Sequence, residues 1–348
     1  MNIIYSPRHT LHNPAREFME GQFSPYLESP ERAEIILNAV QAAGIGAVLE
    51  PGEFGLEAIM AVHSPAYIEH LRTIYERWVA LGGTPEGAYP SAMPRRTLNR
   101  FSPSPWAEIG YYSFDLSAPV TEGTYQAALT SAYCALTGAG HLLAGQKVVY
   151  ALCRPPGHHA GQDFMGGYCY FNNAAIAAHN LTQEGTKRVA ILDIDVHGGN
   201  GTQAIFYDRA DVLFISLHGA PEWEYPYFCG YADEQGEGEG KGFTLNFPLE
   251  KGTDDAAYLD VLDQALARIR DYAPDYVVLS AGFDTFTGDP LGKLKLTTPV
   301  YTVIGQRITA LGLPTLAVQE GGYAIAALGE NAVSLLQGLQ TAPEAPSA

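Results

Sequence analysis

The most informative stretch of this chain is Val189-Ala-Ile-Leu-Asp-Ile-Asp-Val-His-Gly-Gly-Asn-Gly-Thr-Gln203. It begins with continuous apolar residues, a pattern typical of a parallel strand buried on both faces, and becomes polar at its carboxyl end. Side chains alternate along a strand, so we expect Asp193, Asp195 and His197 on one face. Two carboxylates and an imidazole this close favour a metal ion, because like charges repel unless a cation or protons intervene. The alternative is a polar turn whose carboxylates cap the next helix.

Length and composition indicate a globular protein. The 348 residues are 47% hydrophobic and 17% charged, which is enough to bury a large core. The net charge of −18 argues against nucleic acid and anionic membranes as partners and permits a cationic small molecule. We expect neither a signal peptide nor a membrane span. Four cysteines without CxxC spacing indicate free thiols in a reducing compartment, so a cytoplasmic protein is expected.

A second informative block follows a predicted strand at 147–153. In Arg154-Pro-Pro-Gly-His-His-Ala160, paired prolines can continue neither a central strand nor a helix, so they predict a rigid turn. His158 and His159 lie at the end of that turn. Because an imidazole titrates near neutral pH and is the usual general base, we interpret this pair as functional.

Three more predicted strands end in polar residues. They lie at 212–217, 276–279 and 315–318, and they lead to His218, Asp284 and Tyr323. Helices predicted between strands indicate a parallel sheet. The carboxyl ends of parallel strands meet at one edge, so we expect these polar side chains to converge there. Helices are predicted at 30–43, 65–81, 122–144, 254–271 and 299–311.

The fold class predicted from these patterns is a single α/β domain over residues 1–340, with a central parallel sheet flanked by helices and long loops at its carboxyl edge. No linker rich in proline, glycine or serine separates two regions of different composition. The proline-rich segment 82–108 carries Phe101 and Trp106, which would be costly to expose, so we expect a homodimer interface and an active-site rim there. Residues 341–348 are predicted to be a disordered tail.

Five blocks, in this order along the chain, resemble the histone deacetylase family. They are Arg154-Pro-Pro-Gly-His-His159, Gly167-Tyr-Cys-Tyr-Phe-Asn-Asn173, Asp193-Ile-Asp-Val-His197 with Gly199-Asn-Gly-Thr-Gln203, Ser280-Ala-Gly-Phe-Asp284 and Glu320-Gly-Gly-Tyr323. Within that family, the segment from His9 to Gly21 and the proline-rich insertion most resemble the bacterial acetylpolyamine amidohydrolases. The resemblance implies an arginase-like α/β fold, a catalytic zinc ion and hydrolysis of an acetamide to acetate and a free amine.

The resemblance also assigns roles around the metal. The implied zinc ligands are Asp195, His197 and Asp284, with one position left open for water. His159 corresponds to the general base, and His158 to its electrostatic and acid partner. Asp193 and Asn200 correspond to residues that orient these two histidines.

Two further groups are implied by the resemblance. Tyr323 corresponds to the hydroxyl that holds the substrate carbonyl and then the developing oxyanion. A monovalent cation, potassium, is expected near the zinc. Its implied ligands are Asp193, Ser216 and the main-chain oxygens of Asp195, His197 and Leu217.

The chain also departs from the family pattern. Gly198 stands where most relatives carry a second histidine directly after the ligand. Glu17 corresponds to an acidic residue that faces the distal ammonium of a polyamine, whereas the region around Trp106 and Ser117 lacks the acidic side chains expected for a long polyamine. This favours shorter acetylated diamines or another small acetamide. The residues expected to line a narrow slot for the substrate are Gly167, Tyr168 and Tyr225, with ordinary aromatic packing as the alternative for the last.

Other functions share part of this pattern. A deacetylase of acetyl-lysine proteins or peptides would use the same chemistry behind a more open rim. An arginase-type ureohydrolase would need two manganese ions and an extra aspartate, which His197-Gly-Gly-Asn200 does not supply. A non-catalytic sensor of an acetylated ligand would not need the complete set of ligands, base and tyrosine. Iron(II) is an alternative to zinc.

Overall fold

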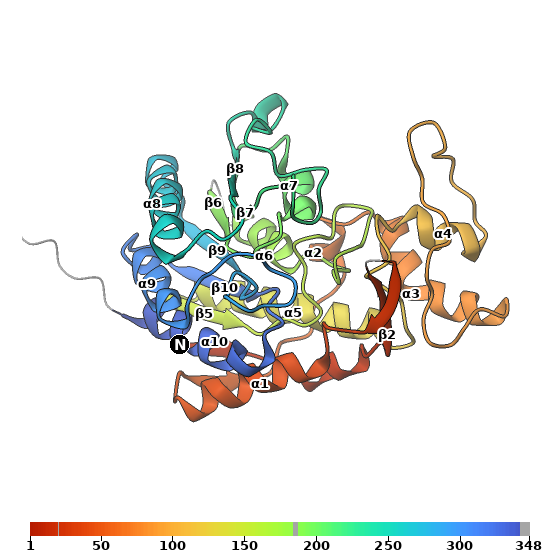
Figure 1. The fold of residues 1–348 in the computed structure, drawn as a ribbon, viewed down its shortest axis with the longest axis horizontal. Helices are drawn as coiled ribbons and strands as arrows, with labels where there is room; N and C mark the ends of the chain where they lie inside the picture. The colour runs from red at the N-terminus through yellow and green to blue at the C-terminus, as the bar shows by residue number, and fades with distance from the viewer. Residues whose placement is uncertain (20, 184–186, 342–348) are drawn as a thin grey trace, which may run out of the picture.

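One sheet of eight parallel strands organises the molecule (Figure 1). The computed structural model describes residues 1–19, 21–183 and 187–341. Every neighbouring pair of strands in this sheet is parallel, which confirms the predicted α/β class. In their order across the sheet, the strands are β4 (Ala47–Leu49), β1 (Asn2–Ile4), β5 (Val148–Ala151), β10 (Thr315–Gln319), β9 (Tyr276–Ala281), β6 (Val189–Asp193), β7 (Val212–Gly219) and β8 (Thr244–Leu249).

Helices cover both faces of the sheet, because side chains that alternate along each strand enter two separate cores. Ile4 and Val149 pack into one core, and Ile3 and Tyr150 pack into the other. The first core is covered by α3 (Pro65–Ala80), α5 (Thr124–Leu143) and α6 (Asn173–Thr182). The second is covered by α1 (Pro30–Ala42), α8 (Asp255–Tyr272), α9 (Thr298–Thr309) and α10 (Ile325–Gln340) (Figure 1).

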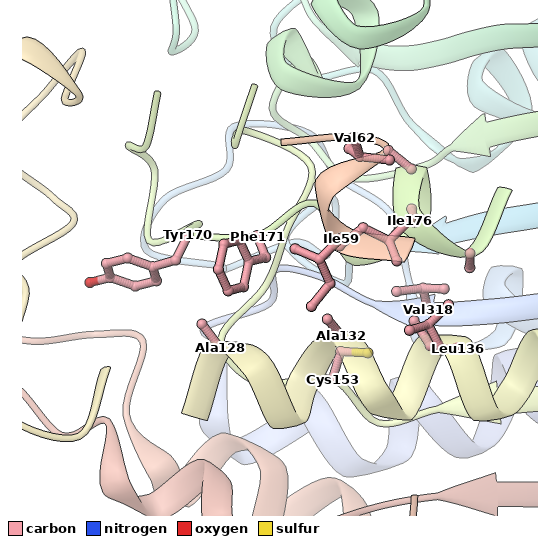
Figure 2. Packing of buried hydrophobic residues seen from close by; sticks show 14 of the residues in the cluster. Ile59, Val62, Ala128, Ala132, Leu136, Cys153, Tyr170, Phe171, Ile176 and Val318 are labelled. Carbon is pink, nitrogen blue, oxygen red and sulfur yellow. The ribbon is translucent and has the colours of Figure 1, made fainter. Parts of the chain in front are cut away.

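Small residues let α5 pack closely on the sheet. Figure 2 shows Ala128, Ala132 and Leu136 of this helix among the buried side chains of the first core. A Cβ atom at Gly138 would come within 2.5 Å of Leu316 Cδ1 in β10. The glycine therefore permits the close approach of helix and strand, and the predicted buried helix is confirmed.

Strand β6 is shorter than the pattern predicts. It ends at Asp193, so Asp195 and His197 lie in the loop that follows rather than on the strand. Side chains replace the sheet as acceptors there, because Asp193 Oδ1 accepts the backbone N–H of Asp195, and Asp195 Oδ1 accepts that of His197. The alternation nevertheless continues, since Ile194 and Val196 remain buried in the second core.

The short elements were not predicted. They are the hairpin β2 (Arg16–Met19) and β3 (Gln22–Pro25), the strands β4 and β8, the helices α2 (Glu57–Met60), α4 (Pro105–Tyr111) and α7 (Asn200–Phe206), and the 3₁₀ turns at Pro7–Leu11 and Gly238–Gly240. Three to seven residues carry too little periodicity to identify such elements. β8 also contains Pro248, which an edge strand tolerates.

The segment before α4 protrudes from one end of the molecule (Figure 1). Its chain runs irregularly from Gly82 until α4 begins at Pro105. Trp106 packs edge-on against Trp78, with ring centroids 4.3 Å apart, yet remains 42% exposed. Of the tail predicted at 341–348, only its first residue lies within the described part of the chain. No helix in that part is long and apolar enough to cross a membrane.

Candidate active site

Three donor side chains meet at the carboxyl edge of the sheet. Asp195 and His197 come from the loop after β6, and Asp284 follows β9. One possible ligand atom from each residue lies within 4.8 Å of the others. His197 Nδ1 is 3.1 Å from Asp195 Oδ1 and 3.3 Å from Asp284 Oδ2. Both aspartates are fully buried and the histidine is 8% exposed, so the three form a compact set of oxygen and nitrogen donors.

The buried carboxyl groups of this set would be stabilised by a nearby positive charge. Burial and the neighbouring Asp195 raise the pKa of Asp284 to about 7. Burial opposes a charge on His197, but its contacts with the two carboxylates outweigh that cost and raise its pKa. Asp284 Oδ2 accepts no hydrogen bond within the described part of the chain. A divalent cation would satisfy that oxygen, so the residues fit zinc or a metal of similar ligand preference such as iron(II).

Two adjacent histidines lie beside the donor set in different environments. His158 Nδ1 is 2.9 Å from Asp193 Oδ2, and His159 Nδ1 is 2.6 Å from Asn200 Oδ1. Burial opposes a charge on both rings, but the carboxylates of Asp193 and Asp195 raise the pKa of His158 to about 10. Burial and the nearby charge of His158 lower the pKa of His159 well below its ordinary value. These shifts favour the charged form of His158 and the neutral form of His159, which can accept a proton.

Backbone contacts hold this histidine pair in place. The N–H groups of Gly157 and His158 donate to Glu320 Oε2, at 2.7 and 3.2 Å. Gly157 is required for this turn, because a Cβ atom there would lie 2.5 Å from the backbone nitrogen of Asn173. The first residues of α7 donate to the carbonyl of His158, so the same helix that positions Asn200 also fixes the turn.

Tyr323 follows β10 and is held through its backbone and its ring. Its N–H donates to Asp289 Oδ2 at 2.7 Å, and the guanidinium of Arg32 lies 4.6 Å from the ring centroid. Arg32 also donates to the carbonyls of Glu320 and Gly322 on either side of the turn. Burial raises the pKa of Tyr323 well above its ordinary value, so its hydroxyl stays protonated and can donate a hydrogen bond.

Comparisons with known proteins agree with this geometry. Residues 26–339 match the model of the histone deacetylase domain. The chain belongs to the histone deacetylase family. Acetylpolyamine amidohydrolase 2 of Pseudomonas aeruginosa is 50% identical over 98% of this chain and 99% of its own length. The acetylpolyamine amidohydrolase of Mycoplana ramosa is 44% identical over 97% of this chain and 99% of its own.

Solved structures of histone deacetylase relatives share the fold. The crystal structure of acetylpolyamine aminohydrolase from Burkholderia pseudomallei has a TM-score of 0.92 and 42% identity, covering 97% of this chain and 98% of the other. The HDA15 HD domain has a TM-score of 0.79 and 30% identity, covering 99% of this chain and 89% of the other. These matches confirm the family resemblance and the predicted fold class.

In this histone deacetylase fold, two of the predicted slot residues lie beside His159 and the third lies beside Tyr323. Gly167 has a φ of 52°, and a Cβ atom there would lie 2.2 Å from His159 Cδ2, so only glycine fits. The ring of Tyr225 stands edge-on to His159, with centroids 5.1 Å apart. Tyr168 packs against Tyr323 at 5.6 Å. The three residues thus lie next to His159 or Tyr323.

Asp115 joins two of these residues and was missed in the sequence. Its Oδ2 accepts the hydroxyl of Tyr225 at 2.7 Å, the N–H of Gly167 at 2.9 Å and the hydroxyl of Ser117 at 2.6 Å. Tyr225 is therefore fixed by a specific hydrogen bond as well as by aromatic packing. A lone carboxylate in a loop without periodicity carries no local signal of this role.

Glu17 lies on β2 and is fully buried. Its Oε1 accepts the N–H of Leu27 at 3.0 Å, while Oε2 has no hydrogen-bond partner within the described residues. Burial raises the pKa of Glu17. Burial and the negative charge of Glu17 also raise the pKa of Tyr168 well above its ordinary value.

Three of the five residues expected around a monovalent cation are neighbours in the sheet. Asp193 of β6 pairs in register with Ser216 of β7, and Leu217 follows directly. Ser216 Oγ lies 2.7 Å from His218 Nδ1. Gly198 lies above the same histidine, and a Cβ atom on it would be 3.4 Å from His218 Cδ2. With glycine at this position, Asp195, His197 and Asp284 still place one ligand atom each within 4.8 Å of the others.

Proposed function

We propose that this chain is a zinc-dependent deacetylase of small cationic substrates. It hydrolyses the acetamide of an acetylated polyamine or diamine, releasing acetate and the free amine. The observation that carries the proposal is that a donor set fitting a divalent cation lies beside a buried neutral histidine, His159. The names of relatives that are 44% and 50% identical, both acetylpolyamine amidohydrolases, support the substrate class.

His159 is the proposed general base. Its Nδ1–H donates to Asn200, which leaves the lone pair on Nε2 to accept a proton from the attacking water. Zinc, held by Asp195, His197 and Asp284, would polarise the substrate carbonyl and lower the pKa of that water. Cationic His158, oriented by Asp193, supports the negative charge that develops nearby.

Tyr323 is the proposed hydrogen-bond donor to the substrate oxygen. Its protonated hydroxyl would stabilise the negative charge that appears on this oxygen as water attacks. When the C–N bond breaks, a histidine of the pair returns a proton to the departing amine. The products are then acetate and an amine, with no further reactant needed.

Selectivity is assigned to the slot and to Glu17. Gly167, Tyr168 and Tyr225 would enclose an extended alkyl chain, and the buried carboxylate of Glu17 would receive a distal ammonium group. With Trp106 and Ser117 in place of further acids, we infer a preference for short acetylated diamines. The net charge of −18 would also attract cationic substrates.

Three further features belong to this proposal. A potassium ion would bind Asp193, Ser216 and the main-chain oxygens of Asp195, His197 and Leu217.

Segment 82–108 would form a homodimer interface and the rim of the active site, because Leu98, Phe101 and Trp106 are 79%, 51% and 42% exposed. The four free cysteines support a reducing, cytoplasmic location.

Acetate release by the zinc-loaded protein tests the proposal. N-acetylputrescine and N-acetylcadaverine are compared with an acetyl-lysine peptide, and His159→Ala serves as the blank. We expect diamine turnover far above peptide turnover, and loss of both in the blank. Equal or faster peptide turnover would instead identify a protein deacetylase. Binding of acetylated ligands without turnover in the zinc-loaded and iron(II)-loaded protein would identify a sensor.

A further inference from the structure

Glu224 is a buried carboxylate that the proposed reaction does not use. It lies in the turn after β7, where its N–H donates to the carbonyl of Ala220, and it is only 7% exposed. Its Oε1 accepts the N–H of Tyr225 at 3.1 Å, whereas Oε2 has no hydrogen-bond partner within the described residues. Gly219 makes room for it, since a Cβ atom there would lie 2.9 Å from Glu224 Cβ.

The imidazole of His197 lies between this carboxylate and the proposed metal ligands. Its Nδ1 faces Asp195 Oδ1 at 3.1 Å and Asp284 Oδ2 at 3.3 Å, on the side of the donor set. Its Nε2 faces the other way, 3.9 Å from Glu224 Oε1. A single ring therefore has carboxylates at both nitrogens, and only one of its two sides belongs to the metal site.

We propose that Glu224 is a positioning residue that accepts the Nε2–H of His197 and so commits Nδ1 to the metal. The inference rests on the metal site of the proposed function. A neutral imidazole carries one N–H, and an acceptor at Nε2 selects the tautomer whose lone pair is on Nδ1. A carboxylate in this position also makes the ligand nitrogen more basic, which strengthens its bond to the metal.

The contact would tighten when the metal is bound. The present separation of 3.9 Å exceeds a direct hydrogen bond, so the two side chains must approach by about 1 Å. A cation at the donor set draws electron density from the ring, which makes Nε2–H a stronger donor. Oε1, the oxygen that faces His197, already accepts the N–H of Tyr225, but a carboxylate oxygen can accept two hydrogen bonds, so the approach need not break that one.

A purely structural role makes a different prediction for the metal-free protein. A buried carboxylate with an unpartnered oxygen is costly, so replacing it by a neutral amide of the same shape should not weaken the metal-free fold. If Glu224 held the turn together instead, replacing it would destabilise the protein both with and without metal. Zinc affinity and metal-free stability therefore separate the two roles.

The experiment measures zinc affinity after the metal is removed with a chelator, by competition with a chromophoric chelator. Wild type is compared with Glu224→Ala, Glu224→Gln and the matched control Glu222→Ala, which changes an exposed glutamate of the same turn. We expect Glu224→Ala to lose about 10- to 100-fold in zinc affinity and the control to lose none. Glu224→Gln should lose less, because its amide oxygen still accepts a hydrogen bond, and its metal-free Tm should be no lower than that of wild type.

Zinc affinity of Glu224→Ala equal to that of the control would overturn the proposal. A fall in metal-free Tm of Glu224→Gln as large as the fall with zinc would also overturn it, because the role would then be structural. Failure of the proposed function itself would give a different experimental result. Wild type and His197→Ala would bind zinc equally weakly, or wild type would bind zinc tightly without releasing acetate from any substrate.

Discussion

Removing one hydroxyl, in Tyr323→Phe, tests the proposed chemistry most directly. The hydroxyl stays protonated because burial raises its pKa, so the variant loses a hydrogen-bond donor and no charge. The ring keeps its neighbours, Arg32 at 4.6 Å and Tyr168 at 5.6 Å, and a phenylalanine ring can make the same contacts. We therefore expect an unchanged fold and a loss limited to the transition state.

The size of that loss follows from the role of the donor. Removing one hydrogen bond to a developing oxyanion costs about 2.7–4 kcal/mol, or about 10²- to 10³-fold in kcat. KM should change little, because the interaction strengthens only as charge develops on the oxygen. Acetate release from N-acetylputrescine by the zinc-loaded protein, measured over a range of substrate concentrations, gives both constants.

Tyr258→Phe is the matched control. Its hydroxyl is also buried but has no hydrogen-bond partner within the described residues, so we expect the rate of wild type and no loss of stability. A kcat for Tyr323→Phe within about threefold of wild type would refute the donor role, since that is well under 1 kcal/mol of barrier. An equal loss of kcat in Tyr258→Phe would show that removing any buried hydroxyl lowers the rate, and would also refute the donor role of Tyr323.

Three further outcomes can be measured. Gly198→Ala should leave activity and stability unchanged, because its Cβ would sit 3.4 Å from the nearest side chain, whereas a Cβ at Gly201 would lie 2.3 Å from a backbone oxygen. Gly201→Ala should therefore lower the free energy of unfolding, measured in urea, by about 1–3 kcal/mol. An equal change in the free energy of unfolding for the two variants would contradict this reasoning. Burial opposes the charge of Glu108, but His70 and Arg77 lower its pKa to about 2. Its stabilisation, up to about 3 kcal/mol, is complete above pH about 4.5 and lost as the pH falls toward 2, so wild type should lose more stability than Glu108→Gln over that range. Glu17→Gln should lower kcat/KM for an acetylated diamine by about tenfold or more and leave an acetyl-lysine peptide unaffected; a parallel loss would argue against recognition of the ammonium.

Local patterns were sufficient to predict the sheet and to bring the donor residues to one edge of it. Apolar runs such as that of β6 report burial on both faces, and alternation with helices requires parallel pairing. The carboxyl ends of parallel strands then have to meet at one edge. Asp195, His197, Asp284 and Tyr323 could thus be placed together without knowledge of their distances.

Local sequence patterns did not predict where β6 ends, because side-chain hydrogen bonds replace strand pairing there. The alternation of apolar and polar residues continues to His197, but β6 ends at Asp193, and the N–H groups of Asp195 and His197 donate to the carboxylates of Asp193 and Asp195 instead of to a neighbouring strand. Short elements such as β8 were missed for a related reason, since their pairing with a long neighbouring strand stabilises them more than their own composition does.

The class of fold, the family and the residues able to hold a metal could be predicted from the sequence, because strand burial and the order of the motifs depend on residues that are close along the chain. How each group is charged and held depends on contacts that exist only in the folded protein. Asp115 reaches Tyr225 across 110 residues and Gly167 across 52, and Glu224, in the turn after β7, lies 3.9 Å from His197, in the loop after β6. Hydrogen bonds and pKa values depend on burial and on distances of a few ångströms. Neither the burial of a residue nor its distance from a partner far along the chain can be predicted from their separation in the sequence.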